Sequence, residues 1–308
     1  MTAFDKPTDP DPSEQMCARI EEVLEQSAVP IRPLSGSIVN VVHTVRCGER
    51  ELIAKSGAGE GIRREAAVLT MLRETKVPVP HAVLLPANPT FPNDLLLLEV
   101  LPGYAAEPDS DVLTDAGESL RRLHDMELPG FGLIGTVHER PTGVFDTWVN
   151  FLATVLADAR QTIPVDVLPV AAHDEVAAHL GRRRIHAHLA GVGRGILLHG
   201  DLMPKHVWSS EGHLAALIDW GDATVGDPLF DLARFSMAGQ EAFQKFLKGY
   251  GNATPPDAYL LSFYRMVWSL MALTVECGAG GDWVDGYRST VRRELGFLQR
   301  FVDQGGHP

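Results

Sequence analysis

The amino-acid sequence predicts an α+β protein of two lobes, a small N-terminal lobe built on an antiparallel sheet and a larger, mainly helical C-terminal lobe. Up to residue 101, short runs of apolar and β-branched residues alternate with turn residues, which is typical of strands. From residue 102 onward, apolar residues recur mainly at helical spacing. We therefore predict a disordered lead over residues 1–14, an N-terminal lobe over 15–101 and a C-terminal lobe over 102–308.

The N-terminal lobe is expected to open with a short helix and a three-stranded meander, because the turns around residues 35–37 and 48–49 are short enough to join antiparallel neighbours. A second helix follows and is ended by Pro78 and Pro80. The predicted elements are helices over 17–26 and 61–74 and strands over 31–34, 39–46, 52–55, 83–85 and 95–100.

The C-terminal lobe is expected to be helical apart from one stretch, residues 196–218, where two short apolar runs flank a polar loop. The predicted helices cover residues 111–126, 145–158, 173–189, 240–250, 257–276 and 282–301. The change of pattern falls at Leu101-Pro102-Gly103, which predicts a hinge with a ligand-binding cleft between the lobes.

Composition excludes several classes of protein. The formal net charge of −13 argues against nonspecific nucleic-acid binding through a basic surface. No uninterrupted apolar stretch is long enough to predict a membrane span. The three cysteines are scattered and form no CxxC pair, which favours reduced thiols in a cytoplasmic protein. The oligomeric state is not predicted by the sequence.

The most informative residues lie in the exceptional stretch. His199-Gly200-Asp201-Leu202 is followed five residues after Asp201 by His206, and then by Asp219-Trp220-Gly221. This order matches the H-x-D and D-x-G elements of phosphoryl-transfer enzymes. In such a site one carboxylate, here Asp201, accepts or orients the proton of the attacking hydroxyl. Asp219 would hold Mg²⁺ against the phosphates, and His206 occupies the slot of a further metal ligand.

Together with Gly226-Asp227-Pro228 and Asp231-Leu232-Ala233-Arg234, these motifs closely resemble the aminoglycoside phosphotransferase family, which includes macrolide and other antibiotic kinases. The resemblance implies a protein-kinase-like fold, ATP or GTP with Mg²⁺ as cofactors, and a small-molecule hydroxyl compound as acceptor. A protein kinase is disfavoured, because only five residues separate Gly221 from Asp227 and no A-P-E motif follows.

The nucleotide site is predicted in the N-terminal lobe. Lys55 ends the third strand, in the position of the lysine that pairs with the α- and β-phosphates. Glu65, in the following helix, is the predicted partner of Lys55, with Glu60 and Glu74 as alternatives.

Backbone groups complete the predicted nucleotide site. The turn containing Gly36 and Ser37 lies where the family covers the phosphates, so its N–H groups are expected to cap phosphate oxygens. Segment 97–103 resembles the hinge of the family. By that likeness the Glu99 carbonyl and the Leu101 N–H would contact the purine, which does not distinguish ATP from GTP.

The chain departs from the family at His206, where Asn is usual and where a His resembles the macrolide-kinase branch. His206 is interpreted as a metal ligand, a phosphate contact or a brace of the loop. Asp227 and Asp231 resemble structural positions and are expected to brace loops and cap a helix. His124 is expected to be a buried histidine with satisfied hydrogen bonds.

The acceptor is expected between the catalytic loop and the C-terminal helices, where carboxylates attract cations and aromatic faces stack on rings. The candidate substrate residues are Trp268, Glu276, Asp282 and Trp283, with Trp148 and Asp285 in the same region. The leading hypothesis is an O-phosphotransferase acting on an aminoglycoside, macrolide, peptide or nucleoside antibiotic. The alternatives are a metabolic kinase of a sugar or amino alcohol, and a nucleotide-binding pseudokinase.

Overall fold

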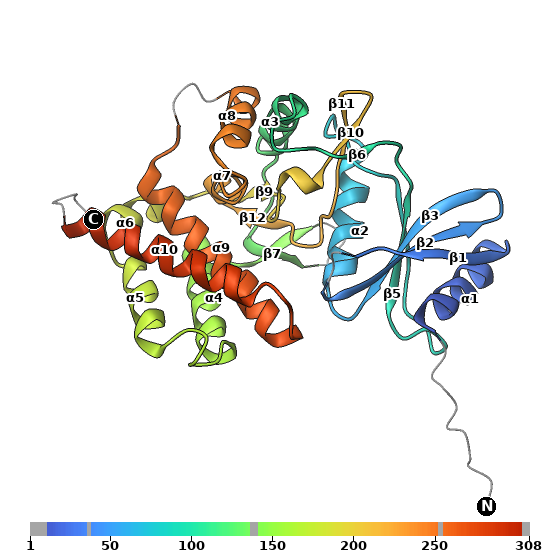
Figure 1. The fold of residues 1–308 in the computed structure, drawn as a ribbon, viewed down its shortest axis with the longest axis horizontal. Helices are drawn as coiled ribbons and strands as arrows, with labels where there is room; N and C mark the ends of the chain where they lie inside the picture. The colour runs from blue at the N-terminus through green and yellow to red at the C-terminus, as the bar shows by residue number, and fades with distance from the viewer. Residues whose placement is uncertain (1–10, 36–37, 136–140, 252–254, 304–308) are drawn as a thin grey trace, which may run out of the picture.

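The computed structural model describes residues 11–35, 38–135, 141–251 and 255–303. Figure 1 shows a sheet with its two helices at one end of the molecule and a larger group of helices at the other. This arrangement confirms the predicted α+β class with a small antiparallel-sheet lobe and a larger, mainly helical lobe.

The N-terminal lobe is a five-stranded antiparallel sheet with the strand order β1-β2-β3-β5-β4. Its strands are β1 (Ala28–Pro33), β2 (Asn40–Cys47), β3 (Arg50–Gly57), β4 (Ala82–Leu85) and β5 (Asp94–Glu99). Helix α1 (Pro12–Leu24) packs on one face of the sheet through Met16 and Ile20. Helix α2 (Gly61–Leu72) connects β3 to β4 and belongs to the larger core.

The continuous apolar run in β5 follows from this two-sided burial. Leu95 and Leu97 belong to the apolar cluster under α1, whereas Leu96 and Leu98 belong to the larger core that includes α2. Because successive side chains of a strand point to opposite faces, a strand covered on both sides needs apolar residues at every position. The central β3 and β5 are thereby fixed between two layers, and β3 carries Lys55.

The predicted disordered lead is too long. Helix α1 begins at Pro12, and the Asp11 side chain caps it by accepting a hydrogen bond from the Ser13 N–H. An aspartate N-cap followed by proline at the first helical position is a strong start signal, which the acidic, proline-rich composition of the segment obscured. Residues 1–10 of the predicted lead lie outside the described residues.

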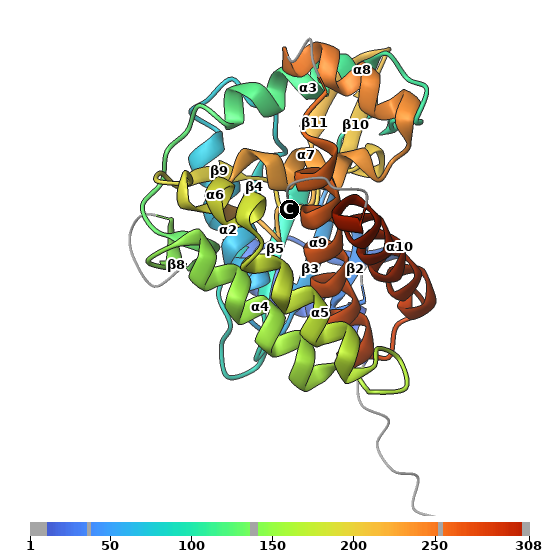
Figure 2. The ribbon, with the colours of Figure 1, turned by 90° about the vertical axis from the view of Figure 1, so that its left-hand side faces the viewer.

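The C-terminal lobe packs around α9, which contacts α4, α7 and α10 (Figure 2). The helices are α3 (Val112–Leu123), α4 (Trp148–Thr162), α5 (Val170–Leu180), α6 (Arg183–Ala190), α7 (Pro228–Ser236), α8 (Gln240–Tyr250), α9 (Ala258–Ala279) and α10 (Val284–Asp303). By length and composition α9 could cross a membrane, but 67% of its apolar window is buried inside the protein, as in a core helix.

Strands in the C-terminal lobe are more numerous than predicted. They form two small sheets with the orders β11-β10-β6 and β8-β7-β12-β9. The strands are β6 (Tyr104–Ala105), β7 (Phe131–Gly135), β8 (Thr142–Phe145), β9 (Ile196–Leu198), β10 (Val207–Ser210), β11 (His213–Leu217) and β12 (Thr224–Gly226). Strands β6, β7, β8, β10 and β12 were missed, and β10 lies in the stretch expected to be a polar loop; each is at most five residues long, too short for alternation to show.

Two helix predictions also need correction. The single helix predicted over residues 173–189 is two helices, because α5 ends at Leu180 with Gly181 as its C-cap and α6 starts after Arg182. Helix α7 was not predicted as a helix, although Asp227 caps it and Pro228 stands at its first position. At nine residues it is too short to show a clear helical period.

Candidate active site

Three predicted residues converge where short strands end. Asp201 follows β9, His206 closes a short 3₁₀ turn (η1, Pro204–His206) before β10, and Asp219 follows β11. Because β10 and β11 form an antiparallel hairpin, the residues before β10 and after β11 are neighbours. One ligand atom from each of the three residues lies within 4.8 Å of the others.

The tautomer of His206 is fixed by the catalytic loop. Its Nδ1 lies 2.7 Å from the Asp201 backbone carbonyl oxygen, which can only accept, so Nδ1 carries the proton. The opposite nitrogen, Nε2, therefore presents a lone pair and lies 3.5 Å from Asp219 Oδ2. Burial lowers the pKa of His206 to about 4, so the ring is neutral at pH 7. The Asp219 carboxylate and a neutral imidazole nitrogen fit a divalent cation, with the Asp201 carboxylate close by.

Lys55 joins the two lobes at this site. Its Nζ lies 2.7 Å from Glu65 Oε2 of α2 and 2.7 Å from Asp219 Oδ1. Burial alone would lower the pKa of Lys55, but the two carboxylates outweigh burial and raise it, so Lys55 is charged. The structure thus brings Lys55 to Glu65, and not to Glu60 or Glu74.

Asp219 adopts an uncommon backbone conformation, with a φ of +67°. An aspartate tolerates this left-handed region better than most residues, but the conformation still has an energetic cost and recurs at functional sites. The nearby charge of Lys55, opposing the effect of burial, holds the pKa of Asp219 well below its usual range. The Asp219 carboxylate is therefore ionised and able to hold a cation.

The loop that carries Asp201 is held by hydrogen bonds to α7. Asp231 of α7 accepts hydrogen bonds from the backbone N–H groups of His199 and Gly200, both at 2.8 Å. His124 lies against Asp231 and Tyr250 with both ring nitrogens hydrogen-bonded, as predicted for a satisfied buried histidine. Asp227 caps α7 at the Leu229 N–H. The expected bracing roles of Asp227 and Asp231 match these contacts.

Gly200 is required by the shape of the loop. Its φ is +85°, and a Cβ placed there would lie 2.0 Å from the backbone carbonyl oxygen of Asp222. A side chain at residue 200 would push apart the segments that carry Asp201 and Asp219. The same contact brings Asp222 close to the catalytic loop. The pKa of Asp222 is raised to about 6, first by desolvation and then by the negative charges of Asp201 and Asp219.

Sequence reasoning missed Arg234. Its Nε donates to Asp201 Oδ1 at 2.7 Å, and its guanidinium carbon lies 3.5 Å from the centre of the Trp268 ring. The signal was present in the Asp231-Leu232-Ala233-Arg234 motif. Residues three apart on a helix share a face, so Arg234 had to point toward the loop that Asp231 anchors.

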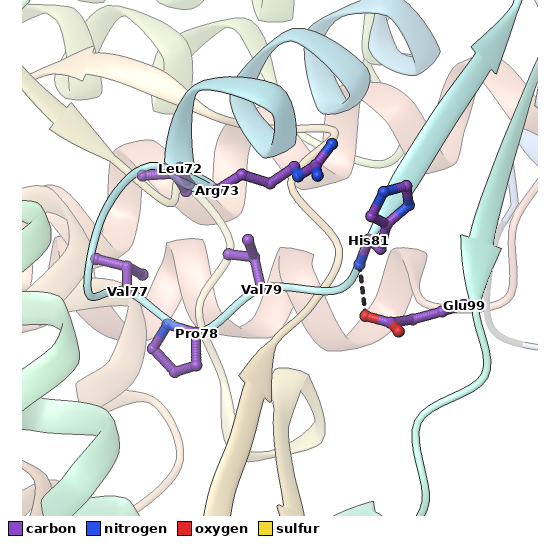
Figure 3. Close-up of a pocket in the computed structure, with 7 residues that line it drawn as sticks. All are labelled: Leu72, Arg73, Val77, Pro78, Val79, His81 and Glu99. Carbon is purple, nitrogen blue, oxygen red and sulfur yellow. Dashed lines mark hydrogen bonds between the residues drawn. The ribbon is translucent and has the colours of Figure 1, made fainter.

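The predicted purine-binding segment makes hydrogen bonds with other parts of the chain. The Leu101 carbonyl accepts a hydrogen bond from Trp208 Nε1 at 3.3 Å. The Glu99 side chain accepts from the His81 N–H in a surface pocket of about 240 Å³ (Figure 3). Neither Lys55 nor Asp201 lines this pocket. Gly36 and Ser37, predicted to cover the phosphates, lie outside the described residues.

The predicted substrate residues do not form one surface. Trp268 is buried at 8% exposure and donates its indole N–H to the Gly200 carbonyl at 2.8 Å, so it supports the loop. Glu276 is also buried and accepts from the Trp283 N–H. Asp282 and the Trp283 side chain are exposed, the latter at 66%.

The two other candidates from this region, one aromatic and one acidic, also lie in different environments. Trp148 is 1% exposed and belongs to the core, where its indole N–H donates to the Tyr264 hydroxyl. Asp285 is exposed and forms an ion pair with Arg288, three residues further along α10. Trp148 is therefore a packing residue.

The fold has two lobes, and a lysine on a strand of one lobe pairs with a glutamate on a helix of the same lobe. The lysine also pairs with an aspartate that follows a short hairpin of the other lobe. This combination defines the class of kinase-like phosphotransferases. A sequence model described as "APH: Phosphotransferase enzyme family" matches residues 30–260. The chain belongs to this phosphotransferase enzyme family. A comparison with curated protein sequences finds no match.

Solved structures show the same fold. A thermostable mutant of aminoglycoside phosphotransferase APH(4)-Ia, in a ternary complex with ADP and hygromycin B, is 18% identical, with a TM-score of 0.70 over 94% of this chain and 98% of that one. A proposed fructosamine-3-kinase from Thermobifida fusca YX-ER1 is 21% identical, with a TM-score of 0.65 over 92% and 98%. LicA in complex with AMP is 16% identical, with a TM-score of 0.68 over 93% and 98%.

Proposed function

We propose that this phosphotransferase moves the γ-phosphate of ATP or GTP onto a hydroxyl group of a small molecule, with Asp201 as the residue that accepts the proton. The observation that carries the proposal is the convergence of Asp201, His206 and Asp219 within 4.8 Å, with Lys55 bridging Asp219 and Glu65. A loose phosphoryl-transfer transition state needs reactants held in line and charge neutralised, and these groups supply both.

Each residue has a separate task in this proposal. Lys55 binds the α- and β-phosphates and is held in place by Glu65. Asp219 and His206 Nε2 hold Mg²⁺, which would neutralise charge on the phosphate oxygens. Two pKa shifts support these tasks: Lys55 holds the pKa of Asp219 low against the effect of burial, and burial lowers the pKa of His206. Backbone groups of Glu99, Leu101, Gly36 and Ser37 remain the proposed contacts of the purine and the phosphates.

The leading candidate for the acceptor is an antibiotic. Phosphorylation of it would give resistance or self-protection, and the proposed location of the protein is the cytoplasm. The support is Asp222, a carboxylate near Asp201 that would attract a cationic drug, whereas the charges of Asp201 and Asp219 are balanced by Arg234 and Lys55. The APH(4)-Ia structure is a ternary complex with ADP and hygromycin B, which favours an antibiotic acceptor. The second candidate is a metabolic acceptor such as a sugar derivative, favoured by the likeness to the proposed fructosamine-3-kinase.

Mass spectrometry of an acceptor panel tests the proposal. The purified protein would be incubated with Mg²⁺ and ATP or GTP, then with aminoglycosides, macrolides, cyclic peptide and nucleoside antibiotics, sugars, fructosamines and choline. We expect one chemical class to gain about 80 Da, the net mass added when a phosphoryl group replaces the hydroxyl hydrogen. Transfer to a sugar, fructosamine or choline alone would favour the metabolic kinase. Nucleotide binding with neither transfer nor hydrolysis would support the pseudokinase and contradict the proposal.

A further inference from the structure

The catalytic carboxylate is held by a pair of side chains from two helices. Arg234 of α7 donates from Nε to Asp201 Oδ1 at 2.7 Å. Trp268 of α9 covers the Arg234 guanidinium at 3.5 Å and donates its indole N–H to the Gly200 carbonyl at 2.8 Å. The pair therefore contacts Asp201 and the residue before it simultaneously.

Both side chains are fixed before any substrate arrives. Arg234 is 5% exposed and Trp268 is 8% exposed. A guanidinium stacked on an indole in a desolvated position is held more strongly than one at an exposed site. Asp231, one turn earlier on α7, fixes the His199 and Gly200 amides, so α7 holds both the backbone and the side chain of the loop. Arg234 thus has little freedom to leave Asp201.

The two oxygens of Asp201 are consequently different. Oδ1 is occupied by Arg234. Oδ2 lies 3.8 Å from His206 Nδ1, beyond hydrogen-bond distance, and no hydrogen bond to it is present in the described parts of the chain. The His206 proton goes instead to the Asp201 backbone carbonyl. One carboxylate oxygen is therefore held and the other is available to the acceptor.

We infer that Arg234, supported by Trp268, is a positioning residue that fixes the Asp201 carboxylate so that Oδ2 receives the acceptor proton. The inference rests on the proposed phosphotransferase function. In the step, the acceptor oxygen bonds to the γ-phosphorus while the bond from that phosphorus to the β,γ-bridging oxygen breaks. The hydroxyl proton passes to Asp201 Oδ2, and the nucleoside diphosphate leaves. Arg234 keeps its own proton throughout.

Steady-state kinetics of Arg234→Ala and Arg234→Lys test this inference. We expect kcat of Arg234→Ala to fall by about 10- to 100-fold, because a displaced catalytic group loses near-attack geometry, with KM for the nucleotide little changed. Arg234→Lys keeps the charge but not the planar stack, so its kcat should be intermediate. Free guanidinium should partly restore kcat of Arg234→Ala by entering the vacated space beside Asp201.

Arg265 provides the matched control. It is an arginine of the same helical core, paired with Glu294 at 3.1 Å and with Ser236, and it makes no contact with Asp201. Arg265→Ala should lower the melting temperature and leave kcat per folded molecule unchanged. An equal kcat for wild type and Arg234→Ala, or a loss matched by Arg265→Ala at equal stability, would overturn the inference.

Two further outcomes separate this inference from the proposed function. If Arg234→Ala does not fold, Trp268→Phe, which removes the pyrrole ring with its N–H and keeps an aromatic face for Arg234, should lower kcat, and an unchanged kcat would overturn the role of the pair. NTP hydrolysis, in which water replaces the acceptor, gives a second readout for every variant. A wild-type protein with neither transfer nor hydrolysis would overturn both proposals, whereas an active wild type with an equally active Arg234→Ala would overturn the positioning role alone.

Discussion

At the scale of single residues, the site depends on a buried lysine with two carboxylate partners. Lys55 has a side chain 9% exposed, and Glu65 has one 2% exposed. A buried charge is tolerated only when it is paired, and removal of one partner leaves the other uncompensated. Glu65 therefore serves two purposes, holding Lys55 toward the phosphates and balancing its charge. Asp219 is the partner that can bind a cation in place of Lys55.

Lys55→Met is expected to lower the free energy of unfolding by about 3–5 kcal/mol, because it leaves the Glu65 carboxylate buried and unpaired. Glu65→Gln in the same background should restore most of that stability without restoring nucleotide binding. Urea unfolding and nucleotide titration measure the two effects. The control is Lys245→Met, whose partner Asp111 is 98% exposed, and it should change stability by less than about 1 kcal/mol. A Lys55→Met protein as stable as this control would contradict the prediction.

At the scale of elements, the helices of the C-terminal lobe cross closely where glycine allows it. Gly117 of α3 lies against α8, and a Cβ at this position would be 2.1 Å from the Phe246 carbonyl oxygen. Gly249 of α8 makes the reciprocal contact with the Thr114 carbonyl of α3. Backbone atoms cannot move aside as a flexible side chain can. The two helices must therefore separate if either glycine gains a side chain.

Gly117→Ala should accordingly destabilise the protein by about 1–3 kcal/mol, as expected for overpacking. Gly278→Ala in α9 is the matched control, because a Cβ there would meet nothing within 4 Å. That change should be neutral or stabilising by up to about 1 kcal/mol, since alanine favours the helix. Chemical denaturation of both variants compares them directly. Equal effects at the two positions would show that α3 and α8 do not cross as closely as described.

Elements with a strong local pattern could be predicted from the sequence. The helix predicted over residues 240–250 coincides with α8, and the expected meander is present as β1, β2 and β3. Several short strands of the C-terminal lobe could not, because their pairing is decided by distant segments; β6, for example, pairs with β10. The catalytic motif predicted that Asp201, His206 and Asp219 act together, and the β10–β11 hairpin brings His206 and Asp219 to the same end.

Contacts between distant helices were beyond sequence reasoning. Trp268 was predicted to bind substrate, since an aromatic residue near a site can either stack on a ligand or pack in the core. Its burial against Arg234 depends on how α9 crosses α7, which no local pattern encodes. The contact between Glu276 and the Trp283 N–H was likewise not predicted, because Trp283 lies in the segment between α9 and α10.

At the scale of the whole molecule, the site exists only where the two lobes meet. The sheet lobe supplies Lys55 and Glu65, and the helical lobe supplies Asp201, His206 and Asp219. The ion pair between Lys55 and Asp219 joins residues 164 positions apart in the chain. Any relative movement of the lobes changes the distance between the proposed phosphate-binding lysine and the proposed proton acceptor.

The central claim is that this assembled site transfers phosphate through Asp201. The most direct test compares wild type with Asp201→Asn in a γ-phosphate transfer assay on the acceptor identified by mass spectrometry. Loss of the proton acceptor should lower kcat by about 10²–10⁴-fold with nucleotide binding close to that of wild type, while the melting temperature falls because the buried Arg234 loses its charged partner. A folded Asp201→Asn protein that transfers phosphate at the wild-type rate would contradict the account.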